Sequence, residues 1–277
     1  MSGFPGALSL VATQVRYQLR VFWRTPVAAF FTLALPILML VLFNALFSGD
    51  VDTDEGSWPV QQFYTGGLAA FSAVSATYTN LANTVPILRD EGVLKRWRST
   101  PLPPWAYVAG MIGSAVIIAL IGVVFMIGLG VVAYDLDLEA AKMPAAVVTF
   151  IVGVGAFAAM GLACAAVVPN ARSAPAVANA TILPLAFISN VFIALDDPPD
   201  WLDAIGDFFP LKPFVIAFQD AFSPFIDAPG FAWGRLGWVA LWGLLGAYLA
   251  VTRFRWEPSP EHAGSTSRRS RRRAAST

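Results

Sequence analysis

The side chains best suited to chemistry lie in a charge-dense block, Leu88 to Gly110, between two long apolar segments. Its first half combines carboxylates with cations: Arg89, Asp90, Glu91, Lys95, Arg96 and Arg98. Charges of both signs on a short exposed segment favour ion pairs with a partner protein. The chain has one histidine, His262 in a polar tail, and one cysteine, Cys164, which leaves almost no material for histidine-based catalysis, a disulfide or a multi-cysteine metal site.

The first half of this block predicts a helix over 88–99. Gly92 is its single helix breaker, and Pro101 ends it. Asp90 and Glu91 lie near its start, where negative charge suits the helix dipole, and Val93, Leu94 and Trp97 supply apolar contact. Such a mixed surface is typical of a docking element. The alternative, a charged loop that only sets membrane topology, needs fewer residues and no tryptophan.

A second group of polar side chains is neutral. Its members recur every three or four residues along 63–88, on one helix face with Asn80 beside it: Ser72, Ser75, Thr79 and Asn83. They either line a substrate path or mediate close helix packing, as small polar residues do in membranes. The long apolar segments contain almost no ionisable residues, which argues against proton coupling. An uncharged path suits a lipophilic or amphipathic cargo.

The elements that position these groups are membrane helices. The chain has 277 residues, of which 57% are hydrophobic and 13% are charged, against about 25% charged in soluble domains. Continuous apolar runs without alternation predict helices, because only helices or closed barrels satisfy the backbone in lipid. The fold class is therefore an all-α integral membrane protein. Six spans are predicted, near 26–47, 63–88, 106–133, 144–168, 174–195 and 233–252.

The distribution of charge predicts the orientation. If six spans alternate from a cytoplasmic N-terminus, then only Lys142, Lys212 and Arg235 among the cations lie outside. Both termini are then cytoplasmic, in the plasma membrane of a bacterium. Zero net charge argues against a nucleic-acid partner.

The segments flanking the spans carry further predictions. Residues 1–25 predict an amphipathic helix at the inner interface, with Arg16, Arg20, Trp23 and Arg24 as its polar face and anchor. The alternative is a basic flank that only enforces orientation. The tail 253–277, rich in Ser and Arg, predicts disorder.

The predicted outer loops differ in character. Residues 48–62 are acidic and predict a flexible loop. Residues 196–230 are too apolar for a linker and predict two short amphipathic helices half immersed near the outer surface, with Trp201, Ile205 and Pro210 as characteristic positions and the second helix over 213–222. No acidic spacing resembles an EF-hand loop, so no metal site is predicted.

At the charged block the sequence resembles the permease subunits of ABC-2 type ATP-binding-cassette transporters, in particular drug and antibiotic exporters of the daunorubicin-resistance type. Their cytoplasmic segment has the form Arg/Glu-x-Glu-Gly-Thr-Leu-Glu-x-Leu-x-x-Thr-Pro-Leu, and the matching residues here are Arg89, Asp90, Glu91, Gly92, Leu94, Thr100, Pro101 and Leu102. The run Pro199, Trp201, Leu202, Ile205, Pro210 and Leu211 resembles the family's outer loop. Val93 and Trp97 depart from the pattern.

The resemblance implies a permease that hydrolyses no ATP itself, in agreement with the absence of a Gly-x-x-x-x-Gly-Lys-Ser/Thr loop. It implies two copies of a separate ATPase that bind ATP and Mg, and a second permease chain in a homodimer or heterodimer. Residues 89–98 would form the coupling helix seated on the ATPase. Alternatives are an exporter of lipid-linked polysaccharide or lipid and, from another class, a membrane-embedded enzyme or a stand-alone channel.

Overall fold

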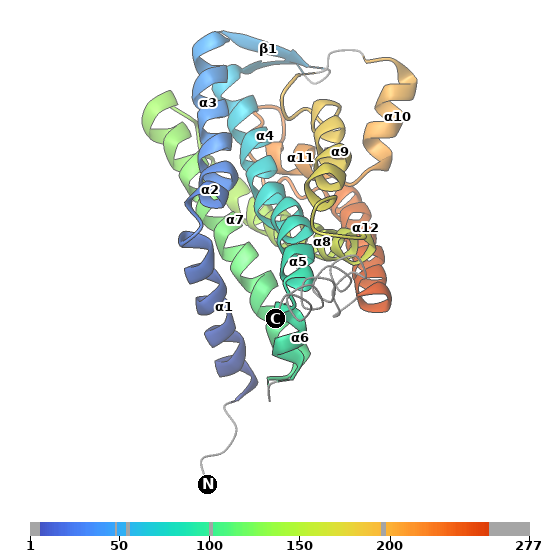
Figure 1. The fold of residues 1–277 in the computed structure, drawn as a ribbon. Coiled ribbons are helices and arrows are strands. Elements are labelled where there is room, and N and C mark those ends of the chain that lie inside the picture. The colour runs from blue at the N-terminus through green and yellow to red at the C-terminus, as the bar shows by residue number, and fades with distance from the viewer. Residues whose placement is uncertain (1–5, 48, 54–55, 100–101, 195–197, 255–277) are drawn as a thin grey trace, which may run out of the picture.

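The structure, a computed structural model, describes residues 6–47, 49–53, 56–99, 102–194 and 198–254. Within these ranges the chain forms a helical bundle with a two-stranded hairpin at one end (Figure 1). We call that end the hairpin end and the opposite one, where α6 (Val93–Arg98) lies, the α6 end. The tail 255–277, predicted to be disordered, lies outside the described residues.

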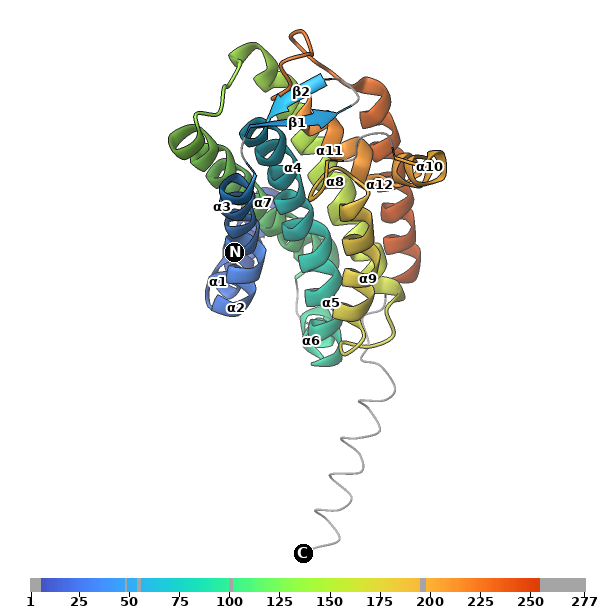
Figure 2. The ribbon, with the colours of Figure 1, turned by 90° about the horizontal axis from the view of Figure 1, so that it is seen from above.

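Three described helices are long and apolar enough to cross a membrane, and they coincide with predicted spans. They are α7 (Pro104–Tyr134), α8 (Met143–Val167) and α12 (Trp233–Arg253). At 1.5 Å per residue α7 is about 46 Å long, so it exceeds a hydrocarbon core of about 30 Å. The chain is therefore an all-α membrane protein, with α4 and α8 between α3 and α7 on one side and α9 and α12 on the other (Figure 2).

The first two predicted spans are helical but interrupted by π turns. Residues 26–46 comprise α2 (Pro26–Ala29), the π turn Phe30–Ala34 and α3 (Leu35–Leu46). Residues 60–90 comprise α4 (Val60–Val74), the π turn Ser75–Thr79 and α5 (Asn80–Asp90). A π turn adds a residue to the helical repeat, so side chains before and after it no longer share one face.

The fifth predicted span is shorter than the sequence indicates. Helix α9 covers only Ala174–Phe187, 14 residues, fewer than the about 20 that cross a bilayer. Pro184 lies inside the helix without interrupting it, and the helix ends at Phe187, before a run of turns in which Asn190 has φ 56°. The predicted continuation to residue 195 is wrong, and six full-length spans are not confirmed.

The hairpin end also departs from expectation. The loop predicted to be flexible forms β1 (Asp50–Thr53) paired antiparallel with β2 (Gly56–Pro59). Trp58 anchors it, because its side chain is buried against Phe63 and Phe225. Two short helices follow α9, α10 (Asp200–Phe208) and α11 (Leu211–Gln219). Helix α10 exposes an apolar face, but α11 is buried almost throughout, so it belongs to the bundle core and is not half immersed.

Helix α8 crosses the π turn Ser75–Thr79 at a close backbone contact. A Cβ placed on Gly161 would lie 2.8 Å from the carbonyl oxygen of Tyr78, whereas a Cβ on Gly155 would meet nothing within 4 Å. We therefore expect Gly161→Leu to lower the melting temperature in detergent by more than 5 °C, since overpacking costs about 1–3 kcal/mol. Gly155→Leu, in the same helix, is the control. It should melt within about 2 °C of the wild type, because the added side chain meets no neighbouring atom there. Equal melting of the two variants would contradict this packing.

Candidate functional site

The predicted docking segment folds as a corner and not as one helix. Helix α5 ends at Asp90, Glu91 and Gly92 form a turn, and α6 begins at Val93. Gly92 has φ 70°, a left-handed conformation that glycine adopts without a steric penalty. The prediction of a single helix over 88–99 is therefore wrong, because Gly92 ends α5 in the way glycine commonly ends helices.

Arg89 and Asp90 of the predicted docking set face inward. The Arg89 guanidinium is 3% exposed, and its Nη2 donates to the carbonyl oxygens of Val168 at 2.9 Å and Pro169 at 3.1 Å. Its Nε lies 3.5 Å from Asp90 Oδ1, and Asp90 Oδ2 accepts from the Ala171 amide at 2.7 Å. Carbonyls at a helix C-terminus lack helical donors, so this pair fastens α5 to the end of α8 and the loop after it.

The apolar residues of α6 also point into the protein. Leu94 is fully buried, and the Trp97 ring lies between two tyrosines. Its centroid is 5.4 Å from that of Tyr107 in α7 and 5.9 Å from that of Tyr17 in α1 (Ala7–Trp23). Aromatic pairs in this range add about 0.5–1.5 kcal/mol beyond burial. Trp97 therefore joins α6 to two other helices, which explains why a tryptophan occurs in a charged segment.

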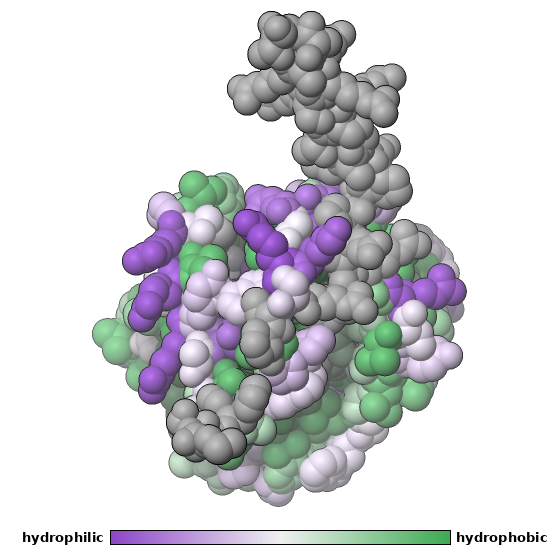
Figure 3. Space-filling model, turned by 60° about the horizontal axis from the view of Figure 1, so that its bottom comes forward, coloured by the Kyte–Doolittle hydropathy of each residue, from purple (hydrophilic) through white to green (hydrophobic). Residues whose placement is uncertain are grey.

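What remains exposed on the corner is charged. Glu91, Lys95 and Arg96 are exposed, and hydrophilic residues gather on the α6 end of the surface (Figure 3). Other exposed cations are those of α1, of the loop after α8 and of the end of α12: Arg16, Arg20, Arg24, Arg172 and Arg253. Exposed charges at the rim of a contact steer a partner and fix its register. The backbone of Arg98 ends α6, and Thr100 and Pro101 lie outside the described residues.

Helix α1 lies alongside the first half of α7 (Figure 1). The contact is close, because a Cβ on Gly110 would lie 2.4 Å from Gln14 Cβ, and Gln14 is buried. Arg16, Arg20 and Arg24 point away from it, and Trp23 is 54% exposed. The amphipathic character predicted for α1 is present, while its location at a membrane interface stays a prediction.

The neutral stripe does not form one continuous face. Ser72 is buried on α4, and a Cβ on Gly122 of α7 would lie 2.5 Å from its Oγ, so Ser72 mediates helix packing. Ser75 and Thr79 in the π turn and Asn80 and Asn83 after it are partly exposed, and Asn80 Oδ1 accepts from Thr84. The packing alternative therefore accounts for Ser72, and a path along the other four stays a prediction.

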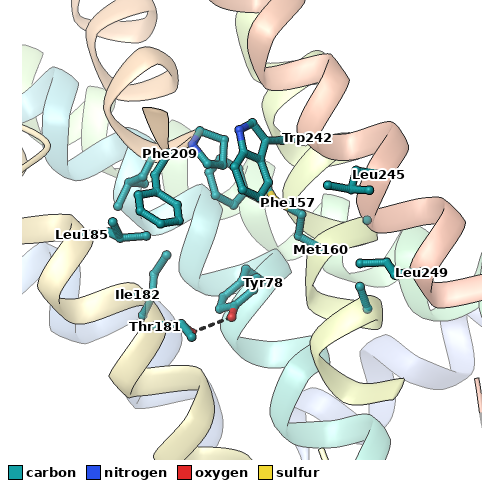
Figure 4. A pocket seen from close by; sticks show the side chains of 14 residues that line it. Tyr78, Phe157, Met160, Thr181, Ile182, Leu185, Phe209, Trp242, Leu245 and Leu249 are labelled. Carbon is teal, nitrogen blue, oxygen red and sulfur yellow. Dashed lines mark hydrogen bonds between the residues drawn. The ribbon is translucent and has the colours of Figure 1, made fainter. Parts of the chain in front are cut away.

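A cavity that the sequence does not reveal lies beside the π turn, where Tyr78 lines it. It measures about 250 Å³ and is bounded by α8, α9, α12 and the Phe209–Leu211 joint between α10 and α11. Ile182 and Leu185 of α9 face Leu245 and Leu249 of α12 across it (Figure 4). These residues belong to uniformly apolar segments, so nothing in their spacing separates them from lipid-facing positions.

The joint between α10 and α11 is held from two sides. Lys212 is buried and pairs with Asp203 and, at 3.0 Å, with Asp207 of α10. Trp238 and Trp242 of α12 both donate their indole N–H to the carbonyl oxygen of Phe208, at 2.9 and 3.0 Å. The three residues predicted as characteristic of the outer helices therefore lie in two environments. Trp201 and Ile205 are on the exposed face of α10, while Pro210 is buried beside the cavity.

Neutralising Lys212 should release α10. Burial lowers the pKa of Lys212, but the hydrogen bonds and charges of Asp203 and Asp207 outweigh it, so its pKa lies above 10.5. The ammonium's stabilising effect is then complete below pH 10.5 and is lost as the pH rises through the raised pKa. We expect Lys212→Met to increase hydrogen exchange in 200–208 by about tenfold or more at pH 7, equivalent to 1.4 kcal/mol. Asp200→Asn, on the same helix, should not increase exchange. Equal exchange in the two variants would contradict the role of the Lys212 ion pairs in holding α10.

In two comparisons the sequence is similar to known proteins. The family model described as ABC-2 type transporter matches residues 10–223. The daunorubicin resistance ABC transporter permease protein DrrB1 of Streptomyces coeruleorubidus is 28% identical over 214 residues, which cover 74% of this chain and 72% of that protein.

Proposed function

This chain belongs to the ABC-2 type transporter family, and from that premise we propose its function. It moves lipophilic or amphipathic compounds out of the cell. Family members are transport subunits, and a separate ABC ATPase hydrolyses the ATP. The chain is accordingly a multi-pass permease subunit of an ABC exporter in the bacterial plasma membrane and is not an enzyme. The substrate class rests on the uncharged spans and on the drug resistance in the relative's name.

The assembly follows from the same proposal. Two permease chains, identical or related, enclose the pathway, and two ATPase subunits carry ATP and Mg. The α6 end and both termini face the cytoplasm, because the exposed cations gather there and cytoplasmic segments are rich in Lys and Arg. The charged face of the corner then lies where a soluble ATPase can reach it.

The coupling role rests on one observation: some side chains of the corner are exposed and others anchor it to neighbouring helices. Glu91, Lys95 and Arg96 are free to meet the ATPase, while Arg89 ties the corner to the end of α8 and Trp97 ties it to α1 and α7. When ATP closes the ATPase dimer, displacement of α6 therefore moves three helices together. Two packings of the permease dimer, open inward or outward, would be biased in this way.

Purification of the tagged chain from native membranes tests this proposal. An ABC ATPase should co-purify, and the complex in inside-out vesicles should accumulate daunorubicin only with ATP and Mg. A vesicle preparation without the ATPase is the control. Recovery of the chain without any ATPase would contradict the assembly, and ATP-independent accumulation would contradict the energy source.

A further inference from the structure

The cavity between α9 and α12 lies at the depth of the hydrocarbon core. Gly246 and Leu245 line it near the middle of α12, a helix long enough to span the membrane. Met160 and Phe157 line it from the central part of α8, another such helix. An apolar cavity of this kind does not retain water, because water needs two to four polar partners.

The cavity opens sideways between two helices. Leu245 of α12 is 49% exposed, and Thr181 of α9 is exposed, so both lie at its rim. Tyr78 and Ile182 are buried at its base. Figure 4 shows the α9 side chains on one side and the α12 side chains on the other, with Phe209 and Trp242 above and Tyr78 below. A membrane-spanning α12 places this rim against lipid tails.

The lining offers no free polar group among its described side chains. The hydroxyls of Tyr78 and Thr181 are 2.6 Å apart and bond to each other, and the indole N–H of Trp242 is bound by the Phe208 carbonyl. An amphipathic compound would bring polar groups that need partners there. A volume of about 250 Å³ is also below the roughly 300–1,000 Å³ typical of drug-sized ligands.

We propose that this cavity holds one acyl chain of a membrane phospholipid, which enters between α9 and α12. A saturated chain needs no hydrogen-bond partner, is narrow enough to enter in part, and is present at the rim in high concentration. The occupied cavity packs α9, which is too short to span by itself, against α12 through the lipid. This site is separate from the docking corner and does not depend on the ATPase.

Photo-crosslinking tests the proposal on the chain alone. The wild type is placed in phosphatidylethanolamine vesicles containing phosphatidylglycerol with a diazirine in one acyl chain, and the labelled peptides are mapped by mass spectrometry. We expect labelling concentrated on the lining residues of α8, α9 and α12. Leu185→Trp with Leu249→Trp fills the cavity from both sides and should lower that labelling at least tenfold.

Matched controls keep the test decisive. Leu183→Trp with Leu244→Trp adds the same bulk on the same helices at exposed positions outside the lining, and should label as the wild type does. Leu245→Trp alone, at the exposed rim, should lower labelling if the double variant fails to fold. Equal labelling of cavity and control variants would overturn the proposal. Loss of wild-type labelling on addition of daunorubicin would also overturn it, by assigning the cavity to transport.

Discussion

Replacing Glu91, Lys95 and Arg96 together with alanine should abolish ATP-dependent export and lower recovery of the ATPase at least tenfold. All three side chains are exposed on the corner, so their loss removes contacts to a partner without opening the core. A tenfold change in affinity is 1.4 kcal/mol, a modest demand on three charged contacts. The measurements are co-purification of the ATPase and daunorubicin accumulation in inside-out vesicles.

The control for this variant removes exposed charge from the opposite end. Asp135→Asn with Asp137→Asn alters two exposed carboxylates after α7 and should leave both readouts unchanged. Full export by the triple variant, with normal membrane insertion, would contradict the docking role of this face. Deletion of 91–97 is a poorer test, because it also removes Leu94 and Trp97 from their buried contacts.

Arg89→Ala should unfold the α6 end of the bundle. The substitution removes the Arg89 donors from three carbonyl oxygens, those of Ala165, Val168 and Pro169, and removes the Arg89 cation from the buried Asp90 carboxylate. Removing one partner of a buried ion pair destabilises by about 3–5 kcal/mol. We expect a lower melting temperature in detergent and faster hydrogen exchange in 165–173, with export lost as a consequence.

Two further variants separate stability from charge. Arg96→Ala removes an exposed guanidinium from the same corner and should change the free energy of unfolding by no more than about 0.5 kcal/mol. Arg89→Lys keeps the charge but cannot reach several carbonyls at once, because an ammonium lacks the planar fork of arginine. Arg89→Lys should therefore restore only part of the melting temperature that Arg89→Ala loses. A melting temperature for Arg89→Ala equal to that of Arg96→Ala would contradict the anchoring role.

The membrane class and much of the helix layout could be predicted from the sequence, because a bilayer demands long apolar segments with charged boundaries. The spans at α7, α8 and α12 were located within two residues at each end. Interruptions were harder to foresee, since the π turns after Ala29 and Val74 occur in sequences with ordinary helical composition. The end of α9 could not be read from its proline, because Pro184 in α9 and Pro86 in α5 both lie inside helices that continue past them.

The docking segment was found from its charge, but the orientation of its side chains could not be predicted. Arg89 and Asp90 read as surface residues because charged groups are usually exposed. Their partners are backbone atoms of 165–171, which lie far along the chain, and backbone acceptors leave no trace in side-chain composition. The signal for the corner in the sequence is Gly92, because glycine commonly ends a helix in the left-handed conformation found here.

The bond from Arg89 to the carbonyls after α8 has a consequence for protein engineering. The last turn of α8 is completed by a side chain that belongs to a different span, so neither segment is a self-sufficient module. A chimaera that exchanges residues 89–98 with those of a relative, to redirect the permease to another ATPase, must exchange 165–173 in the same step. The natural boundary for such a graft encloses two stretches that are separated in sequence and joined through one guanidinium.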